Sequence, residues 1–362
     1  MSLEDLIAAA GERGDDVADL FAYFRTQGIA DTEIADAALN GDLTSLEFDR
    51  RLRLAELTLD DLAAASSATP DEIVEAYRLM GIPVDDSHGP MFDQAEQRIV
   101  ELVRAAAAAL PAGMTEEILR SIGAGIATVA ESAVAAYVGS VEDLYDDRSL
   151  REKALATNAV GSLALELGTL LGPLLRHHLW IATYRQREAM REALDRRQST
   201  LTVGFVDLVG FTSTTESMTP DALLAFMRGF HSTAFDIVTS AGGRLVKHIG
   251  DEIMFTAASP ERACTIALDL LDGFPNTGSR PRAGLAHGVV VARHGDVYGP
   301  VVNTAARLTD IAVSGEVLAD AHIAALLDDS HQFLVEPAGR RQLKGFSEPT
   351  RVVSIDRVTR DP

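Results

Sequence analysis

The residue pattern changes at one place in the chain, near Ser199, and this change limits what the chain can fold into. Before it, helix-start signals and apolar residues at helical spacing recur. After it, short apolar runs alternate with helical segments, as in domains that combine helices with a sheet. A chain of 362 residues is long enough for two or three domains with separate cores. We predict a helical domain over residues 1–180, a connecting helix over 181–199 and a second domain over 200–362.

Composition narrows the class of protein. Hydrophobic residues make up 47% of the chain, which is typical of a folded protein, and the net charge is −22. Such a charge opposes binding to nucleic acid and to anionic membrane surfaces. The single cysteine, Cys264, excludes an internal disulfide, and the first residues lack the basic and apolar pattern of a signal peptide. These features predict a cytoplasmic protein that has no nucleic acid partner.

The helical half carries two capping boxes. Thr58 is followed three positions later by Asp61, and Thr69 is followed by Glu72 in the same way. Residues 69–83 also resemble the first half of a helix-turn-helix motif, which would indicate a transcription factor. No basic cluster follows to meet phosphate, so we interpret this region as part of a helical bundle.

One apolar stretch, residues 154–175, is nearly long enough to cross a membrane. It contains Asn158, Glu166 near its middle, and Pro173, and a charged side chain at mid-bilayer is costly. We therefore predict a buried or dimer-facing helix pair and no transmembrane segment. The next stretch, 181–199, alternates Arg with Glu or Asp, which is typical of a solvated connecting helix.

The second domain is predicted to be ferredoxin-like, of the polymerase-palm type, which makes the whole chain an α+β protein. The order strand, helix, hairpin, helix, strand is typical of that sheet. The expected segments are 201–206, 220–238, the arms 244–249 and 253–257, 261–271, and 282–292, followed by another helix and strands near 333–335 and 352–355.

Two aspartates are predicted to hold metal. Asp207 ends the first strand, and Asp251 lies at the tip of the hairpin, 44 positions later. In a palm-type sheet these strands are neighbours, so the two carboxylates converge and repel each other unless cations intervene. Mg²⁺ takes hard oxygen ligands, often one or two carboxylates together with substrate phosphates. Two such ions can activate an attacking oxygen and clamp phosphate groups.

Three stretches together resemble the catalytic domain of class III adenylyl cyclases over residues 200–355. They are 205–212 (FVDLVGFT), 246–255 (VKHIGDEIMF) and 296–307 (DVYGPVVNTAAR). The resemblance implies that Asp207, Asp251 and the Leu208 carbonyl hold two Mg²⁺ or Mn²⁺ ions per active site. It also implies that the turn containing Phe211 and Thr212 meets the phosphates, at the start of a helix.

Other residues of these motifs fit an adenine nucleotide. A lysine donor and an aspartate acceptor match the edge of adenine and leave mispaired groups against guanine, so Lys247 and Asp296 favour ATP. Asn303 and Arg307 are four positions apart on one helix face. The resemblance assigns Asn303 to orienting the ribose and Arg307 to stabilising the transition state, and it matches Lys344 to a position that meets the terminal phosphates.

The expected reaction is conversion of ATP to 3′,5′-cyclic AMP and pyrophosphate, in a head-to-tail homodimer whose sites combine residues of both chains. The helical half resembles the regulatory domains of mycobacterial-type cyclases, which implies autoinhibition released by acid pH or a lipid-like ligand. We hypothesise that His177 and His178 sense pH. The alternatives are a diguanylate or guanylyl cyclase, since 250–253 (GDEI) partly resembles a diguanylate cyclase loop, and a regulator that senses nucleotide without turnover.

Overall fold

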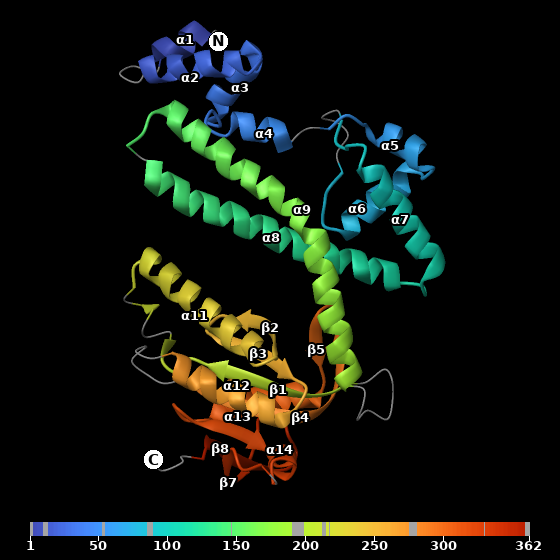
Figure 1. Ribbon diagram of the computed structural model, residues 1–362, viewed down its shortest axis with the longest axis vertical. Coiled ribbons are helices and arrows are strands. Elements are labelled where there is room, and N and C mark those ends of the chain that lie inside the picture. Colours follow the sequence, from blue (N-terminus) through green and yellow to red (C-terminus); the bar gives the residue numbers. More distant parts are fainter. Residues whose placement is uncertain are drawn as a thin grey trace. The chain divides into compact units, whose positions relative to one another are not determined.

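The computed structural model describes residues 3–9, 14–52, 55–84, 90–145, 147–189, 199–211, 215–216, 218–274, 281–328 and 330–358. They belong to two compact units, Met1–Arg176 and His177–Pro362 (Figure 1). The first unit is helical, and the second combines helices with a sheet. The fold class therefore agrees with the prediction.

The first unit contains α1 to α8 and most of α9. Their bounds are α1 Leu3–Ala9, α2 Gly14–Thr26, α3 Asp31–Asn40, α4 Leu46–Leu52, α5 Leu59–Ser66, α6 Pro70–Leu79, α7 Glu96–Ala109, α8 Met114–Tyr145 and α9 Leu150–Ala189. Two separate cores stabilise it. Phe21 and Phe24 of α2 are buried in one, and Ile73 and Tyr77 of α6 in the other.

Both predicted helix starts are present. The Thr58 hydroxyl accepts from the Asp61 N–H at 3.2 Å, and the Asp61 carboxylate accepts from the Thr58 N–H at 3.0 Å. Thr69 and Glu72 form the same reciprocal box at the start of α6. Each box satisfies backbone N–H groups that have no partner inside the helix, so these boundaries follow from the local sequence.

For residues 154–175 we predict a buried or dimer-facing helix pair, and the structure contradicts both the pair and its burial within this chain. The stretch lies inside one continuous helix, α9, which contains Pro173. Many of its apolar side chains are exposed; Leu163, for example, is 67% exposed. An apolar pocket of about 420 Å³ is lined by residues of α8 and α9, together with Phe48 and Leu52 of α4. Whether this face meets a second copy stays a prediction.

Two helices of the described chain are long and apolar enough to cross a membrane, judged by length and composition. They are Met114–Ala136 and Leu150–Arg187, and only 11% and 17% of their most apolar stretches are buried. They therefore differ from the core helices of a globular domain, whose apolar windows are mostly buried. The predictions of no transmembrane segment and of a cytoplasmic location stay predictions.

The second unit is built on one sheet, together with the last turns of α9. Its strands are β1 Ser199–Asp207, β2 Arg244–Ile249, β3 Glu252–Ala257, β4 Arg282–Arg293, β5 Asp296–Tyr298, β6 Val317–Asp320, β7 Phe333–Arg341 and β8 Thr350–Arg357. The strand order is β2-β3-β1-β4-β6-β8-β7, and the short β5 pairs with β4. The part β2-β3-β1-β4 is the ferredoxin-like arrangement that the sequence predicts.

Helices cover both faces of this sheet. They are α11 Pro220–Ser240, α12 Pro260–Gly273, α13 Pro300–Ile311 and α14 Ala321–Leu326. Side chains alternate between the two faces of the sheet along β1. Val206 therefore lies in the core shared with α11 and α12, whereas Val203 and Phe205 lie in the core shared with α13. The sequence predicts β1 to β4, α11 and α12 closely, whereas β5 and β6 are not among the expected strands. Of the predicted connecting helix, 181–189 form the end of α9, and 190–198 lie outside the described residues.

Candidate active site

Two carboxylates far apart in the sequence meet at one end of the sheet. Asp207 is the last residue of β1, and Asp251 lies in the turn that joins β2 to β3. The antiparallel register pairs Asp207 with Glu252, the residue that follows Asp251. Burial raises the pKa of Asp251, and the negative charge of Asp207 raises it further. The structure thus brings the predicted aspartate pair within electrostatic reach.

Glu252 is a third carboxylate that the sequence reasoning missed. Burial, followed by the charges of Asp207, Asp310 and Asp251, raises the pKa of Glu252 to about 7. Its position next to Asp251 on a strand paired with β1 is the signal that would have revealed it. Three acidic groups therefore share this end of the sheet, and their mutual repulsion favours a positive charge among them.

Arg282 is the second residue that was missed, and it supplies such a charge. It begins β4, directly opposite Asp207 in the register. Its Nε and Nη2 both donate to Asp207 Oδ2, at 2.8 and 2.6 Å. Its Nη1 donates to the Asp310 carbonyl at 2.9 Å. Arg282 therefore orients the Asp207 carboxylate and also anchors the end of α13 beside it.

The donor set at this end of the sheet fits a divalent cation. Asp207 and Asp251 present hard carboxylate oxygens whose repulsion a cation relieves. Among the described residues, no group of three or more His, Cys, Asp or Glu side chains is arranged to hold a metal by itself. The fit is therefore to an ion whose remaining ligands come from phosphate and water, as Mg²⁺ prefers.

The turn after Asp207 is described only in part. The Leu208 carbonyl accepts from the Phe211 N–H at 3.2 Å, which closes the turn. The Leu208 side chain is buried, and the Phe211 ring packs against Phe226 with centroids 5.9 Å apart. The roles predicted for Leu208 and Phe211 stay predictions, and Thr212 lies outside the described residues.

The predicted base-reading pair is in contact. Lys247 Nζ lies 2.5 Å from Asp296 Oδ2, although the residues are 49 positions apart. Asp296 begins β5, and its other carboxylate oxygen accepts from the Val297 N–H at 2.8 Å. Burial alone would raise the pKa of Asp296, but the hydrogen bonds from Lys247 and Val297 lower it. A cationic donor and an ionised acceptor therefore stand side by side.

The remaining predicted residues lie on α13 and near β8. Asn303 and Arg307 occupy successive turns of α13, and Asn303 is exposed. Arg307 Nη1 lies 2.7 Å from the Asp310 carboxylate, so it reaches Arg282 indirectly, through Asp310. Lys344 is exposed in the segment between β7 and β8. Among the described residues, no hydrogen bond or ion pair joins Asn303 or Lys344 to the aspartate pair.

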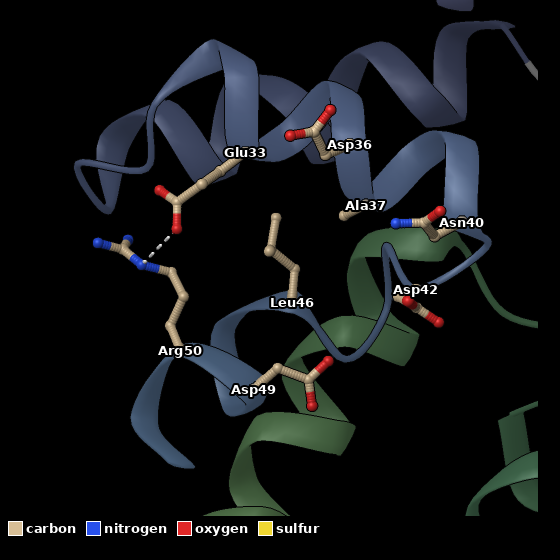
Figure 2. A pocket seen from close by; sticks show the side chains of 8 residues that line it. All are labelled: Glu33, Asp36, Ala37, Asn40, Asp42, Leu46, Asp49 and Arg50. Carbon is tan, nitrogen blue, oxygen red and sulfur yellow. Dashed lines mark ion pairs between the residues drawn. The ribbon is translucent and has the colours of Figure 1, made fainter. Parts of the chain in front are cut away.

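A separate acidic hollow lies in the helical unit. Figure 2 shows Glu33 and Asp36 on α3 and Asp49 on α4 around the side chain of Leu46. Glu33 is paired with Arg50 at 3.5 Å, and the Asp49 carboxylate accepts from the Ser45 hydroxyl at 2.8 Å. Glu33 and Asp49 therefore have ordinary partners on the surface.

Comparison with known proteins defines the class of protein to which this geometry belongs. The family model described as adenylate and guanylate cyclase catalytic domain matches residues 195–355. The adenylate cyclase of Streptomyces coelicolor is 34% identical over 272 residues, covering 72% of this chain and 69% of that protein. The chain belongs to the class III adenylyl and guanylyl cyclases, with the catalytic domain at its C-terminal end and a helical region before it.

Two mycobacterial proteins are also similar. An uncharacterized protein of Mycobacterium tuberculosis is 31% identical over 360 residues, covering 97% of this chain and 93% of that protein, so the similarity includes the helical region. A protein of the same species named pH-sensitive adenylate cyclase is 30% identical over 214 residues, covering 55% of this chain and 54% of that protein.

Proposed function

We propose that this chain is an adenylyl cyclase, a phosphorus–oxygen lyase that converts ATP to 3′,5′-cyclic AMP and pyrophosphate. The contact between Lys247 and Asp296 carries the proposal, because it presents a donor beside an acceptor. Adenine offers an acceptor at N1 and a donor at N6, whereas guanine offers the reverse. Relatives named adenylate cyclase support the same choice of base.

The ribose 3′-hydroxyl releases its proton to solvent as its oxygen bonds to the α-phosphorus, and the bond from that phosphorus to the oxygen that bridges to the β-phosphate breaks. Bound Mg²⁺ or Mn²⁺, two ions per site, would supply charge neutralisation for the phosphates and acidify the attacking hydroxyl. Asp207 and Asp251 would hold these ions, and Arg282 keeps Asp207 oriented. Asn303 is assigned to orienting the ribose. Arg307 offers a guanidinium to the charge that develops on the phosphate oxygens.

The direct test is to incubate the purified full chain with ATP or GTP and Mn²⁺ and to identify the product by chromatography. Cyclic AMP is the expected product, and preferential formation of cyclic GMP would contradict the base assignment. Lys247→Gln and Asp296→Asn should lower the preference for ATP by about tenfold or more, because each leaves one edge of adenine mispaired. Lys153→Gln, in the helical unit, is the matched control and should leave the preference unchanged.

We also propose that the active enzyme is a head-to-tail homodimer and that the helical region regulates it. A relative named pH-sensitive adenylate cyclase supports a link to pH. His177 and His178 are exposed on α9. Replacing both with alanine and measuring cyclic AMP production between about pH 5.5 and 8 tests their part, since an unchanged profile would exclude them as sensors.

A further inference from the structure

A second pocket lies in the catalytic unit, at the opposite end of the strands from Asp207 and Asp251. Its volume is about 400 Å³, and its lining includes Ser199 at the start of β1 and Ala257 at the end of β3. The last turns of α9 form its other wall, where Ile181 and Arg185 line it. A pocket of this size accommodates a small organic molecule.

Three arginines line this pocket. Arg185 comes from α9, Arg244 from the start of β2 and Arg262 from α12. Burial lowers the pKa of Arg185, and the positive charges of Arg244 and Arg262 lower it further. The Arg185 guanidinium is therefore close enough to both of the others to be repelled by them, which costs stability unless an anion lies nearby.

Two of these arginines, Arg185 and Arg244, donate to backbone carbonyl groups and not to carboxylates. Arg185 Nη2 donates to the Gly243 carbonyl at 3.2 Å, and Arg244 Nη2 donates to the Gly295 carbonyl. Among the described residues, none of the three forms an ion pair, although the chain carries 54 acidic residues. The charge of Asp296 reaches Arg244, but the Asp296 carboxylate is hydrogen-bonded to Lys247. The positive charge of the pocket is therefore available to a ligand.

We propose that this pocket is a binding site for a small molecule that carries a phosphate or carboxylate group. A planar guanidinium matches the oxygens of either group with paired hydrogen bonds. The rest of the lining is mainly apolar, with Leu201, Ala292 and Val297 beside the arginines, and it accommodates the body of such a molecule. The bound anion would tie the end of α9 to the strands that carry Lys247 and Asp296.

The single tryptophan of the chain provides a local probe. Trp180 precedes the lining residue Ile181 on α9 and is 70% exposed. In metal-free buffer of low ionic strength without nucleotide, titration of the full chain with inorganic phosphate should change Trp180 fluorescence to saturation. The double variant Arg185→Gln/Arg262→Gln should bind phosphate at least about tenfold more weakly, because two charge-assisted contacts are lost. Arg187→Gln, an exposed arginine on the same helix outside the lining, should bind as the wild type does.

Two further arms complete the test. In the first, phosphatidic acid vesicles replace inorganic phosphate, which distinguishes a lipid headgroup from a free anion as the ligand. A saturable fluorescence change that requires Arg185 and Arg262, with either probe, supports the site. If neither probe changes the fluorescence, or if the double variant responds as the wild type does, the proposal is overturned. Should the glutamine variant fail to fold, Arg185→Lys/Arg262→Lys keeps both charges without the fork. Its affinity for phosphate should fall severalfold, and an unchanged affinity would equally overturn the proposal.

Discussion

At the scale of single residues, Arg282 shows how the site is organised. Its guanidinium holds Asp207 with two hydrogen bonds while it anchors the Asp310 carbonyl. Asp207 itself is recognisable in the sequence because it ends an apolar strand and precedes a glycine turn. Arg282 is not, because its role depends on the register that places the start of β4 beside the end of β1.

Replacing Arg282 should therefore reduce catalysis without abolishing the fold. Arg282→Gln removes both hydrogen bonds to Asp207, and loss of a residue that orients a metal ligand typically costs about 10- to 100-fold in activity or metal affinity. The measurement is the rate of cyclic AMP formation as Mn²⁺ is varied. Arg340→Gln, an exposed strand arginine, is the control. Activity within twofold of the wild type at every Mn²⁺ concentration would show that Arg282 does not position Asp207.

At the scale of elements, α9 differs most from what its sequence suggests. Its glycines and Pro173 suggest breaks, yet the helix continues from Leu150 to Ala189. One glycine has a packing reason. A Cβ at Gly161 would stand 2.2 Å from the ring of Phe48 on α4, whereas a Cβ at Gly168 meets nothing within 4 Å.

These two glycines give a matched pair of substitutions. Gly161→Ala should destabilise the helical unit by about 1–3 kcal/mol, because the new methyl group forces Phe48 to move. Gly168→Ala should be neutral or stabilise it by up to about 1 kcal/mol, because alanine is the better helix former. Denaturant unfolding followed by circular dichroism measures both, and equal effects of the two substitutions would contradict the packing at Phe48.

The contact between α11 and β2 predicts a dependence of stability on pH. His231 and His248 stack with ring centroids 3.9 Å apart, and His231 Nε2 and His248 Nδ1 are buried without a hydrogen-bond partner in the described structure. Burial lowers the pKa of both, and the charge of His231 lowers the pKa of His248 further. The unfolded chain then takes up protons more readily than the folded one.

Stability from this pair is complete above the ordinary histidine pKa of 6.5 and falls as the pH drops below it. The melting temperature should therefore decrease between about pH 7.5 and 5.5, and His231→Phe should make that decrease smaller. His331→Gln, at an exposed position, should leave the decrease unchanged. A steeper decrease in His231→Phe than in the wild type would contradict a lowered pKa for the stacked histidines.

At the scale of the whole molecule, the proposed head-to-tail dimer takes the aspartate pair of each active site from one chain and Arg307 from the other. An Asp251→Asn chain and an Arg307→Ala chain should each be inactive alone. Mixed in equal amounts, they should recover about a quarter of the wild-type activity, because half of randomly assorted dimers are mixed and each of those has one intact site. Mixing Asp207→Asn with Asp251→Asn should recover nothing, since both lesions fall on the same side of every site. Equal recovery in both mixtures would contradict the shared site.

The local sequence by itself determined the helix starts and the core strands of this protein. The capping boxes at Thr58 and Thr69 and the alternation around Val206 act over a few residues, so their outcome can be derived without the fold. The motifs that carry Asp207, Asp251, Lys247 and Asp296 were recognisable for the same reason. Their chemistry depends on residue type at short spacing.

Only the tertiary structure decided which distant groups meet and which apolar faces remain uncovered. Glu252 and Arg282 join Asp207 through the strand register, and Arg185, Arg244 and Arg262 converge from three elements. The apolar composition of α9 led us to expect burial, and only the tertiary structure shows that most of its apolar stretch is exposed. Strand register, the meeting of distant side chains and the burial of a helix face depend on contacts between residues far apart in the chain. Short-range sequence patterns do not specify those contacts.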